Sequence, residues 1–120
     1  MTTKNLTTAD FQATISANPI VIVDFWASWC GPCRAFAPVF DRSSQAHPDV
    51  LHAKVDTEAQ QQLAAALEIQ AIPTIMAFRD GILVYRQPGA MPAAALEDLI
   101  TRVKALNMAD VRAKAAAAQR

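Results

Sequence analysis

Residues 21–36 read VIVDFWASWCGPCRAF, and this stretch holds the strongest information about the fold. It contains both cysteines and both tryptophans of the chain, and it places one carboxylate, Asp24, in its most apolar part. An unpaired carboxylate among apolar side chains is costly, and burial raises its pKa. The stretch therefore raises the question of why an aspartate stands shortly before a cysteine pair.

The apolar run Ile20–Trp26 predicts a strand that is buried on both faces. Within it Ile22, Asp24 and Trp26 share one face, because side chains alternate along a strand. Both faces are apolar, so we expect buried neighbours around the carboxylate whichever way it points. Two interpretations follow. In the first, the aspartate has no catalytic part and lies on a partly open strand or pairs with Lys54. In the second, it is a general base that exchanges protons with a thiol.

Strands and helices are expected to alternate on both sides of this stretch. Thr7 and Asp10 have the spacing of a capping box, which predicts a helix that ends near Pro19. A second helix is expected from Cys33 to His47. The other expected elements are a strand at 50–56, a helix at 58–69, two strands within 74–87 joined by Asp80-Gly81, and a helix from Pro92 to about Leu106.

This order of elements predicts an α/β fold with a central mixed sheet and helices on both faces. Strands that alternate with helices pair in parallel, and the hairpin at Asp80-Gly81 adds an antiparallel pair. Residues 108–120, MADVRAKAAAAQR, differ in composition and offer little apolar surface for burial, and helices this short are marginal alone. We expect one domain over residues 1–106 and an extension over 107–120 that is a frayed helix or disordered.

The composition excludes several classes of function. The chain has 120 residues, of which 52% are hydrophobic, enough for one domain with a sizeable core. Lysine plus arginine and aspartate plus glutamate number 11 each, so no excess charge indicates nucleic acid or an anionic membrane as partner. No apolar run could span a bilayer, and residues 1–11 lack a secretory signal. We therefore expect a cytoplasmic protein, in which two cysteines indicate catalytic or metal chemistry.

Cys30 and Cys33 stand where the buried strand ends and the next helix begins. Residues three apart on a helix lie about 5–6 Å from each other, which suits a disulfide. A helix N-terminus carries partial positive charge and free N–H groups, which favour a thiolate. Cys30, nearer the exposed turn, is then the attacking thiol and Cys33 the resolving thiol. Between them Gly31 permits the turn and Pro32 fixes the backbone angle φ.

Other uses of a cysteine pair fit this sequence less well. The spacing C-x2-C-x13-H-x4-H, with His47 and His52, falls within the range of a zinc finger. Pro48 should end the helix that such a finger needs, however, and His52 falls in a strand pattern. A covalent haem site needs histidine after the second cysteine, where this chain has Arg34. Two unrelated structural thiols are the alternative without chemistry.

The motif WCGPC at Trp29–Cys33 resembles the active-site motif of the thioredoxin family, and the resemblance covers about residues 5–106. Further matches are DFWAS before the motif, Pro38 after it, AKVD at 53–56, IPT at 72–74, DG at the hairpin and GA at 89–90. The resemblance implies a thioredoxin fold and a small protein disulfide reductase without a cofactor of its own. A thioredoxin reductase, which holds flavin and uses NADPH, recharges the disulfide of such proteins.

The resemblance also implies roles for residues outside the cysteine motif. It makes Asp24 the base that deprotonates Cys33, with Lys54 modulating the charge of the aspartate. It makes the Ile72-Pro73 bond cis, although an X-Pro bond is trans by default. The residues expected to contact client proteins are Trp29, Gly31, Pro32, Ile72, Pro73 and Gly89.

The family implies a general dithiol–disulfide reductase that acts as a monomer. Its implied partners are thioredoxin reductase and clients such as ribonucleotide reductase, peroxiredoxin and methionine sulfoxide reductase. Disulfide-forming relatives are the nearest rival, but they usually carry histidine between the cysteines. A non-redox interaction module on the same fold is the alternative from another class, and the presence of both cysteines disfavours it. Leu67, Glu68 and Pro88 depart from the family pattern, and Pro88 leaves client preference open.

Overall fold

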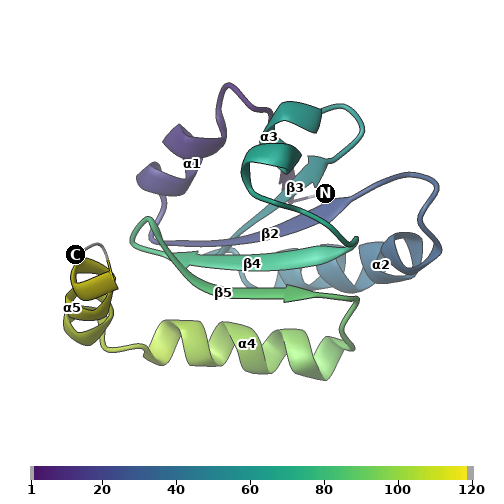
Figure 1. Cartoon of the computed structure of the whole chain (residues 1–120). Helices are drawn as coiled ribbons and strands as arrows, with labels where there is room; N and C mark the ends of the chain where they lie inside the picture. Colours follow the sequence, from purple (N-terminus) through teal and green to yellow (C-terminus); the bar gives the residue numbers. More distant parts are fainter. Residues whose placement is uncertain (1, 119–120) are drawn as a thin grey trace.

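A five-stranded mixed sheet forms the centre of the fold (Figure 1). The computed structural model describes residues 2–118 of the chain. In spatial order β1-β3-β2-β4-β5, β2 pairs in parallel with β3 and antiparallel with β4, while β5 pairs antiparallel with β4. The predicted α/β fold with a mixed sheet is confirmed. The strands are β1 (Thr3–Asn5), β2 (Ile20–Trp26), β3 (Leu51–Asp56), β4 (Thr74–Arg79) and β5 (Ile82–Pro88).

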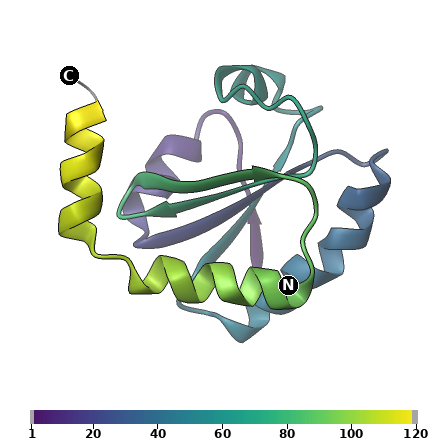
Figure 2. The ribbon, with the colours of Figure 1, turned by 60° about the horizontal axis from the view of Figure 1, so that its bottom comes forward.

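Helices cover both faces of the sheet, as Figures 1 and 2 show. On one face lie α1 and α3, and on the other lie α2 and α4 (Figure 1). A fifth helix, α5, follows α4 and lies beside the turn between β4 and β5 (Figure 2). The helices are α1 (Phe11–Ala17), α2 (Gly31–Ala46), α3 (Gln61–Ala66), α4 (Ala93–Ala105) and α5 (Met108–Ala118). None of these helices is long and apolar enough to cross a membrane.

The central strand β2 divides the core into two halves. Its odd-numbered side chains, such as Val23 and Phe25, join the core half beneath α1 and α3. Its even-numbered Ile22 joins the half beneath α2 and α4, which includes Phe36 and Phe40. Because side chains alternate along a strand, Asp24 faces the same side as Ile22, toward α2. The carboxylate and the helix that carries the cysteine pair therefore lie on one face of the sheet.

Two local features predicted from the sequence, the capping box and the hairpin turn, are present. The N–H of Thr7 donates to Asp10 Oδ1 at 2.7 Å and the N–H of Asp10 to Thr7 Oγ1 at 3.4 Å, which is the reciprocal pairing of a capping box. At the hairpin, Asp80 and Gly81 have φ of 53° and 81°, as a two-residue turn that matches the strand twist requires. This turn places β5 at the edge of the sheet.

Two elements differ from the sequence expectation, and the C-terminal segment takes one of its two expected forms. The strand β1 was not expected, because three polar residues show no apolar alternation, and it exists through parallel pairing with β3. The helix α3 is shorter than expected, since residues 57–59 form a turn that Asp56 Oδ1 stabilises and Glu68 adopts a positive φ. Residues 108–118 form a helix, one of the two forms expected for this segment, and its residue Met108 is buried.

Candidate redox site

The cysteine pair lies at the carboxyl end of β2, where the chain enters α2. Cys30 and Cys33 form a disulfide with their Cα atoms 5.2 Å apart. Both are nearly inaccessible, with exposed fractions of 5% for Cys30 and 3% for Cys33. Exposure therefore does not distinguish an attacking from a resolving sulfur in this disulfide form.

The start of α2 does distinguish the two sulfurs. Cys30 is the N-cap residue of α2, and its Sγ accepts a hydrogen bond from the N–H of Cys33 at 3.2 Å. Pro32 stands in the first turn, where its lack of an N–H costs nothing and its fixed φ suits the helix. A sulfur at an N-cap receives both a backbone donor and the positive end of the helix dipole. In the reduced protein these interactions favour the thiolate of Cys30 over that of Cys33.

A second segment, the loop before β4, packs against the disulfide. The Ile72-Pro73 bond is cis, as the family resemblance implied. Cys30 Sγ lies 3.7 Å from the carbonyl oxygen of Ile72, and the side chain of Ile72 packs on the cysteine pair. The N–H of Gly89, which has a φ of 102°, donates to the Pro73 carbonyl at 2.7 Å. Residues distant in sequence thus meet beside the sulfurs.

Asp24 is completely buried on β2. Within the part of the chain that the structure describes, neither carboxylate oxygen has a hydrogen-bond partner. Removal from water raises the pKa of Asp24 to about 7, and the nearby charge of Lys54 lowers it by a smaller amount. The carboxyl group can therefore exchange a proton near neutral pH, as a general acid or base must.

Lys54 occupies the position beside Asp24 on the parallel strand β3. Its ammonium group lies 5.0 Å from the centroid of the Trp26 ring, which is a cation–π distance. The pairing of Asp24 with Lys54 that the sequence left open does not include a hydrogen bond among the described residues, since both Asp24 oxygens are without partners. The charge of Lys54 lowers the pKa of Asp24 by less than burial raises it.

Trp29 is 64% exposed, on the turn that precedes the cysteines. Its indole Nε1 donates to Glu58 Oε1 at 2.6 Å, which fixes the ring above the turn. Glu58 was not identified from the sequence, although a signal was present: β2 and β3 run in parallel, so the loops after Trp26 and Asp56 meet at one edge. A carboxylate just after β3 therefore lies beside a tryptophan just after β2.

Arg34 is the other neighbour that sequence reasoning did not assign to the site. Its Nη1 donates to the carbonyl oxygen of Ser28 at 2.9 Å, so a cation spans the turn that contains the cysteines. The closest atom to a Cβ built on Gly31 is the Arg34 Nη2, at 4.0 Å. The turn between Cys30 and Cys33 is therefore open on its outer side.

The zinc-finger arrangement considered from the sequence does not form. His47 caps the far end of α2 and pairs with Glu97 at 2.7 Å, and His52 is buried in β3. Within residues 2–118, no group of three or more histidine, cysteine, aspartate or glutamate side chains is placed to hold a metal ion. The cysteines are bonded to each other instead.

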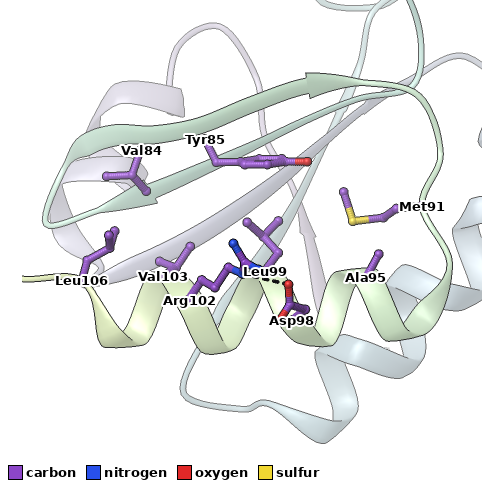
Figure 3. A pocket seen from close by; sticks show the side chains of 9 residues that line it. All are labelled: Val84, Tyr85, Met91, Ala95, Asp98, Leu99, Arg102, Val103 and Leu106. Carbon is purple, nitrogen blue, oxygen red and sulfur yellow. Dashed lines mark ion pairs between the residues drawn. The ribbon is translucent and has the colours of Figure 1, made fainter.

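A hollow of about 470 Å³ lies between β5 and α4, away from the disulfide (Figure 3). Tyr85 and Met91 project into it, and the ion pair between Asp98 and Arg102, at 2.9 Å, closes one side (Figure 3). None of its lining residues belongs to the segments that surround the cysteines. The hollow is therefore separate from the redox site.

Comparisons with known proteins agree with this geometry. A model of the thioredoxin family matches residues 2–102. A putative thioredoxin 2 from Streptomyces coelicolor is 49% identical over 117 residues, which make up 98% of this chain and 87% of that protein. Thioredoxin-1 from Saccharomyces cerevisiae is 36% identical, over 78% of this chain and 91% of its own length.

Solved structures show the same likeness. Oxidised mitochondrial thioredoxin 3 from Saccharomyces cerevisiae has a TM-score of 0.77 and 35% identity, over 83% of this chain and 94% of that chain. A mutant thioredoxin from Halobacterium salinarum has a TM-score of 0.80 and 32% identity, over 87% and 92% of the two chains. The matches span the disulfide, the strand that leads to it and the cis-proline loop, and the chain therefore belongs to the thioredoxin family of dithiol–disulfide oxidoreductases.

Proposed function

We propose that this thioredoxin is a general protein disulfide reductase in which Cys30 attacks and Cys33 resolves. The Cys30 thiolate attacks one sulfur of a client disulfide, forms a mixed disulfide and releases the other client sulfur as a thiolate. Cys33, once deprotonated, attacks Cys30 Sγ, which closes the Cys30–Cys33 disulfide and releases the second client thiolate. The client is reduced by two electrons and the dithiol is oxidised by two.

The observation that supports this order most directly is the hydrogen bond from the Cys33 N–H to Cys30 Sγ. It places the thiolate-stabilising end of α2 on Cys30, which makes this sulfur the stronger candidate for the nucleophile at neutral pH. Cys33 lies one turn into the helix and is within bonding distance of Cys30. That position suits intramolecular attack on the mixed disulfide.

Asp24 is proposed as the base that takes the proton from Cys33 in the resolving step. A carboxyl with a pKa of about 7 is present in both protonation states near neutral pH, which general catalysis requires. Asp24 lies on the face of the sheet that α2 covers, and Cys33 is a residue of α2. Lys54 is proposed to modulate this base, since its charge lowers the pKa of Asp24.

Client proteins are proposed to bind as an extended segment across the cis-proline loop. The Ile72 side chain packs on the cysteines, and the backbone of Ile72 is proposed to pair with a client strand. Pro73 brings no N–H of its own, and Gly89 leaves the surface beside it without a side chain. The proposed contact set is Trp29, Gly31, Pro32, Ile72, Pro73 and Gly89.

The electron donor proposed for the oxidised form is a thioredoxin reductase, which supplies flavin and NADPH, so the chain transfers electrons with its own cysteines. Proposed clients are peroxiredoxin, ribonucleotide reductase and methionine sulfoxide reductase. One similar structure, 34% identical with a TM-score of 0.77, comes from work on thiol resolution in yeast mitochondrial 1-Cys peroxiredoxin through glutathione and thioredoxin systems. We place this reductase in the cytoplasm, as a monomer in cell redox homeostasis.

The test distinguishes the attacking role of Cys30 from the resolving role of Cys33. Reduced Cys33→Ser protein mixed with insulin should accumulate a covalent complex, because the mixed disulfide forms and no thiol resolves it. Reduced Cys30→Ser protein should form none. Non-reducing electrophoresis and mass spectrometry give the yields, and the wild type should accelerate insulin reduction by dithiothreitol.

The outcomes bear on separate parts of the proposal. Equal trapping by the two variants, or faster alkylation of Cys33 than of Cys30 by iodoacetamide, would show that the roles are reversed or shared. A wild type that leaves the rate of insulin reduction unchanged would exclude a general reductase.

A further inference from the structure

Arg86, on the edge strand β5, clamps the end of the helix that precedes the cis-proline loop. Its Nη1 donates to the carbonyl oxygen of Leu67 and its Nη2 to that of Glu68, both at 2.7 Å. The last carbonyls of a helix have no intrahelical donor and carry partial negative charge. One planar guanidinium therefore binds the carbonyl of the C-cap residue Leu67 and that of the next residue, Glu68, at once.

The clamped residues adopt a conformation that needs support. The N–H of Ile69 donates to the Ala64 carbonyl at 2.9 Å and that of Glu68 to the Ala65 carbonyl at 3.0 Å, which is the pattern of a Schellman motif. The residue at the turning position of this motif is usually glycine, because its φ is positive. Here it is Glu68, with a φ of 54°, a region that side chains with a Cβ disfavour.

Strand β5 and the residue after it hold both ends of the segment 67–73. Arg86 binds its first two carbonyls, and the N–H of Gly89 binds the carbonyl of its last residue, Pro73, at 2.7 Å. Between these points the segment leads to Ile72, whose carbonyl and side chain contact the cysteine pair. The position of the Ile72 backbone is thus set from β5.

We propose that Arg86 is a positioning residue for client binding: it holds the segment 67–73 so that Ile72 presents its backbone to the client. This inference rests on the proposed client-binding role of Ile72 and Pro73. Arg86 is exposed and acts through backbone carbonyls rather than on a sulfur. Its removal should therefore slow the reduction of protein disulfides, while a disulfide too small to pair with backbone should react at an unchanged rate.

The chain contains a matched control for this clamp. Arg79, on the neighbouring strand β4, donates from Nη1 to the carbonyls of Val103, at 2.7 Å, and Lys104, at 3.2 Å. These carbonyls end α4, at the opposite end of the sheet from the cysteines. Both arginines cap a helix terminus, but only the clamp of Arg86 adjoins the cis-proline loop. Arg86→Met and Arg79→Met remove comparable hydrogen bonds from different places.

The experiment compares two rate constants for each reduced protein, one with insulin and one with hydroxyethyl disulfide. In Arg86→Met we expect the insulin constant to fall by roughly tenfold, since small misplacements of a binding group cost this much or more. Its hydroxyethyl disulfide constant should stay at the wild-type value. Arg79→Met should keep both constants. Adding Glu68→Gly to Arg86→Met should restore the insulin constant, because glycine holds the positive φ without the clamp.

Each contrary outcome overturns something specific. If Arg86→Met reduces insulin as fast as Arg79→Met, the positioning role is wrong. If Glu68→Gly does not restore the rate, Arg86 acts on the client directly and the inference is again wrong. If Arg86→Met does not unfold cooperatively, Arg86→Lys is used in its place. Lysine has one ammonium nitrogen and cannot bind both carbonyls in the geometry of a guanidinium, so this variant should lose part of the rate of insulin reduction.

The proposed function is tested separately in the same system. In the complex of Cys33→Ser with insulin, the Ile72 amide should exchange its hydrogen more slowly than in the free protein, since it pairs with the client. If the Ile72 amide exchanges as fast in the complex as in the free protein, both client pairing at Ile72 and the role of Arg86 are wrong. If it is protected in the complex, an unaffected Arg86→Met overturns the role of Arg86 alone.

Discussion

At Asp24, burial has one consequence for stability and another for chemistry. The pKa of the folded carboxyl is about 7, against 3.8 for the ordinary group, because burial penalises its charged form. The folded state therefore binds this proton more tightly than the unfolded state does. By linkage, the contribution of Asp24 to stability is greatest below pH 3.8 and is lost as pH rises through 7.

We expect Asp24→Asn to stabilise the protein at pH 8 and to slow it as a reductase. The amide keeps the shape of the carboxyl and cannot ionise, so the gain at pH 8 approaches, at most, roughly 4 kcal/mol at 1.36 kcal/mol per pKa unit. At pH 4, where the folded carboxyl is neutral and the pH is close to the ordinary pKa of 3.8, the gain should be small. Client reduction should slow because the base for Cys33 is missing. Denaturant unfolding of the oxidised proteins and insulin-reduction rates measure the two effects.

A surface carboxylate provides the control for this substitution. Asp98 on α4 is 61% exposed and pairs with Arg102 at 2.9 Å, an arrangement that contributes little to stability. Asp98→Asn should therefore change neither the pH dependence of unfolding nor the rate. An Asp24→Asn protein that is less stable than wild type at pH 8 would mean that the carboxylate is stabilised in the fold. An unchanged rate would remove Asp24 from the mechanism.

At the scale of single residues, the sequence predicts those features that depend only on a residue's neighbours in the chain. The burial of Asp24 follows from the apolar residues on both sides of it, and the exposure of Trp29 from its place in a turn. The bond between Trp29 and Glu58 depends on two loops that only the register of β2 and β3 brings together. The clamp of Arg86 on Leu67 depends likewise on strand placement, so neither is readable from a local pattern.

Between elements, a buried histidine joins α2 to β3. His52 is fully buried, its Nδ1 lies 2.9 Å from the Val50 carbonyl and its Nε2 lies 2.8 Å from Ser43 Oγ. Since a carbonyl only accepts, Nδ1 carries the proton and Nε2 accepts from the serine hydroxyl. The ring of Phe40 packs beside it, with centroids 5.0 Å apart. The neutral imidazole is thus satisfied on both nitrogens.

Protonation of this histidine should weaken the contact between α2 and β3. Burial lowers the pKa of His52 below its usual 6.5, His47 lowers it further, and the Val50 carbonyl, Glu97 and Asp49 oppose the shift. The unfolded state therefore binds this proton more readily than the folded state. The contribution of His52 to stability is present above pH 6.5 and is lost as pH falls from there through the lower pKa of the folded state. The pH dependence of this contribution is opposite in sign to that of the contribution of Asp24.

In an Asp24→Asn background, where the opposing group is absent, the free energy of unfolding should fall as pH is lowered from 8 to 5. The expected fall is about 1.4 kcal/mol for each unit by which the pKa of His52 is lowered. Adding His52→Leu should abolish this slope, whatever its effect on absolute stability. His47→Gln, which changes the partly exposed histidine that pairs with Glu97, should leave most of the slope in place, because burial is the larger cause of the lowered pKa of His52. A slope that disappears with His47→Gln and persists with His52→Leu would contradict the assignment.

At the scale of elements, apolar periodicity was sufficient where a segment is long and buried. It predicted β2, α2, the hairpin and α4 from their own residues. It did not predict β1, whose three residues form a strand only by pairing with β3. It also extended α3 too far, because helix-forming residues continue through Leu67 while Glu68 turns the backbone away. In both cases tertiary contacts override local propensity.

Across the whole molecule, the redox site and the C-terminal helix occupy opposite ends of the sheet. The cysteines follow Trp26 at one end of β2, whereas Ile20 at the other end pairs with Arg79, beside the β4–β5 turn. The helix α5 lies at this turn (Figure 2), where Arg112 Nη1 is 3.7 Å from Asp80 Oδ2. We propose that residues 1–106 form the redox domain and that 107–120 is an extension that adds stability only.

Deletion of residues 108–120 should leave disulfide reduction intact and lower stability modestly. Met108 is the buried residue of α5, and burial of a methionine side chain contributes about 1.5–3 kcal/mol. The exposed pair of Arg112 and Asp80 should add little to this. Met108→Ala in the full chain should reproduce most of the loss in denaturant unfolding. Rates with insulin and with hydroxyethyl disulfide should match the wild type, and a selective loss of insulin reduction in the truncated protein would show that the extension takes part in client binding.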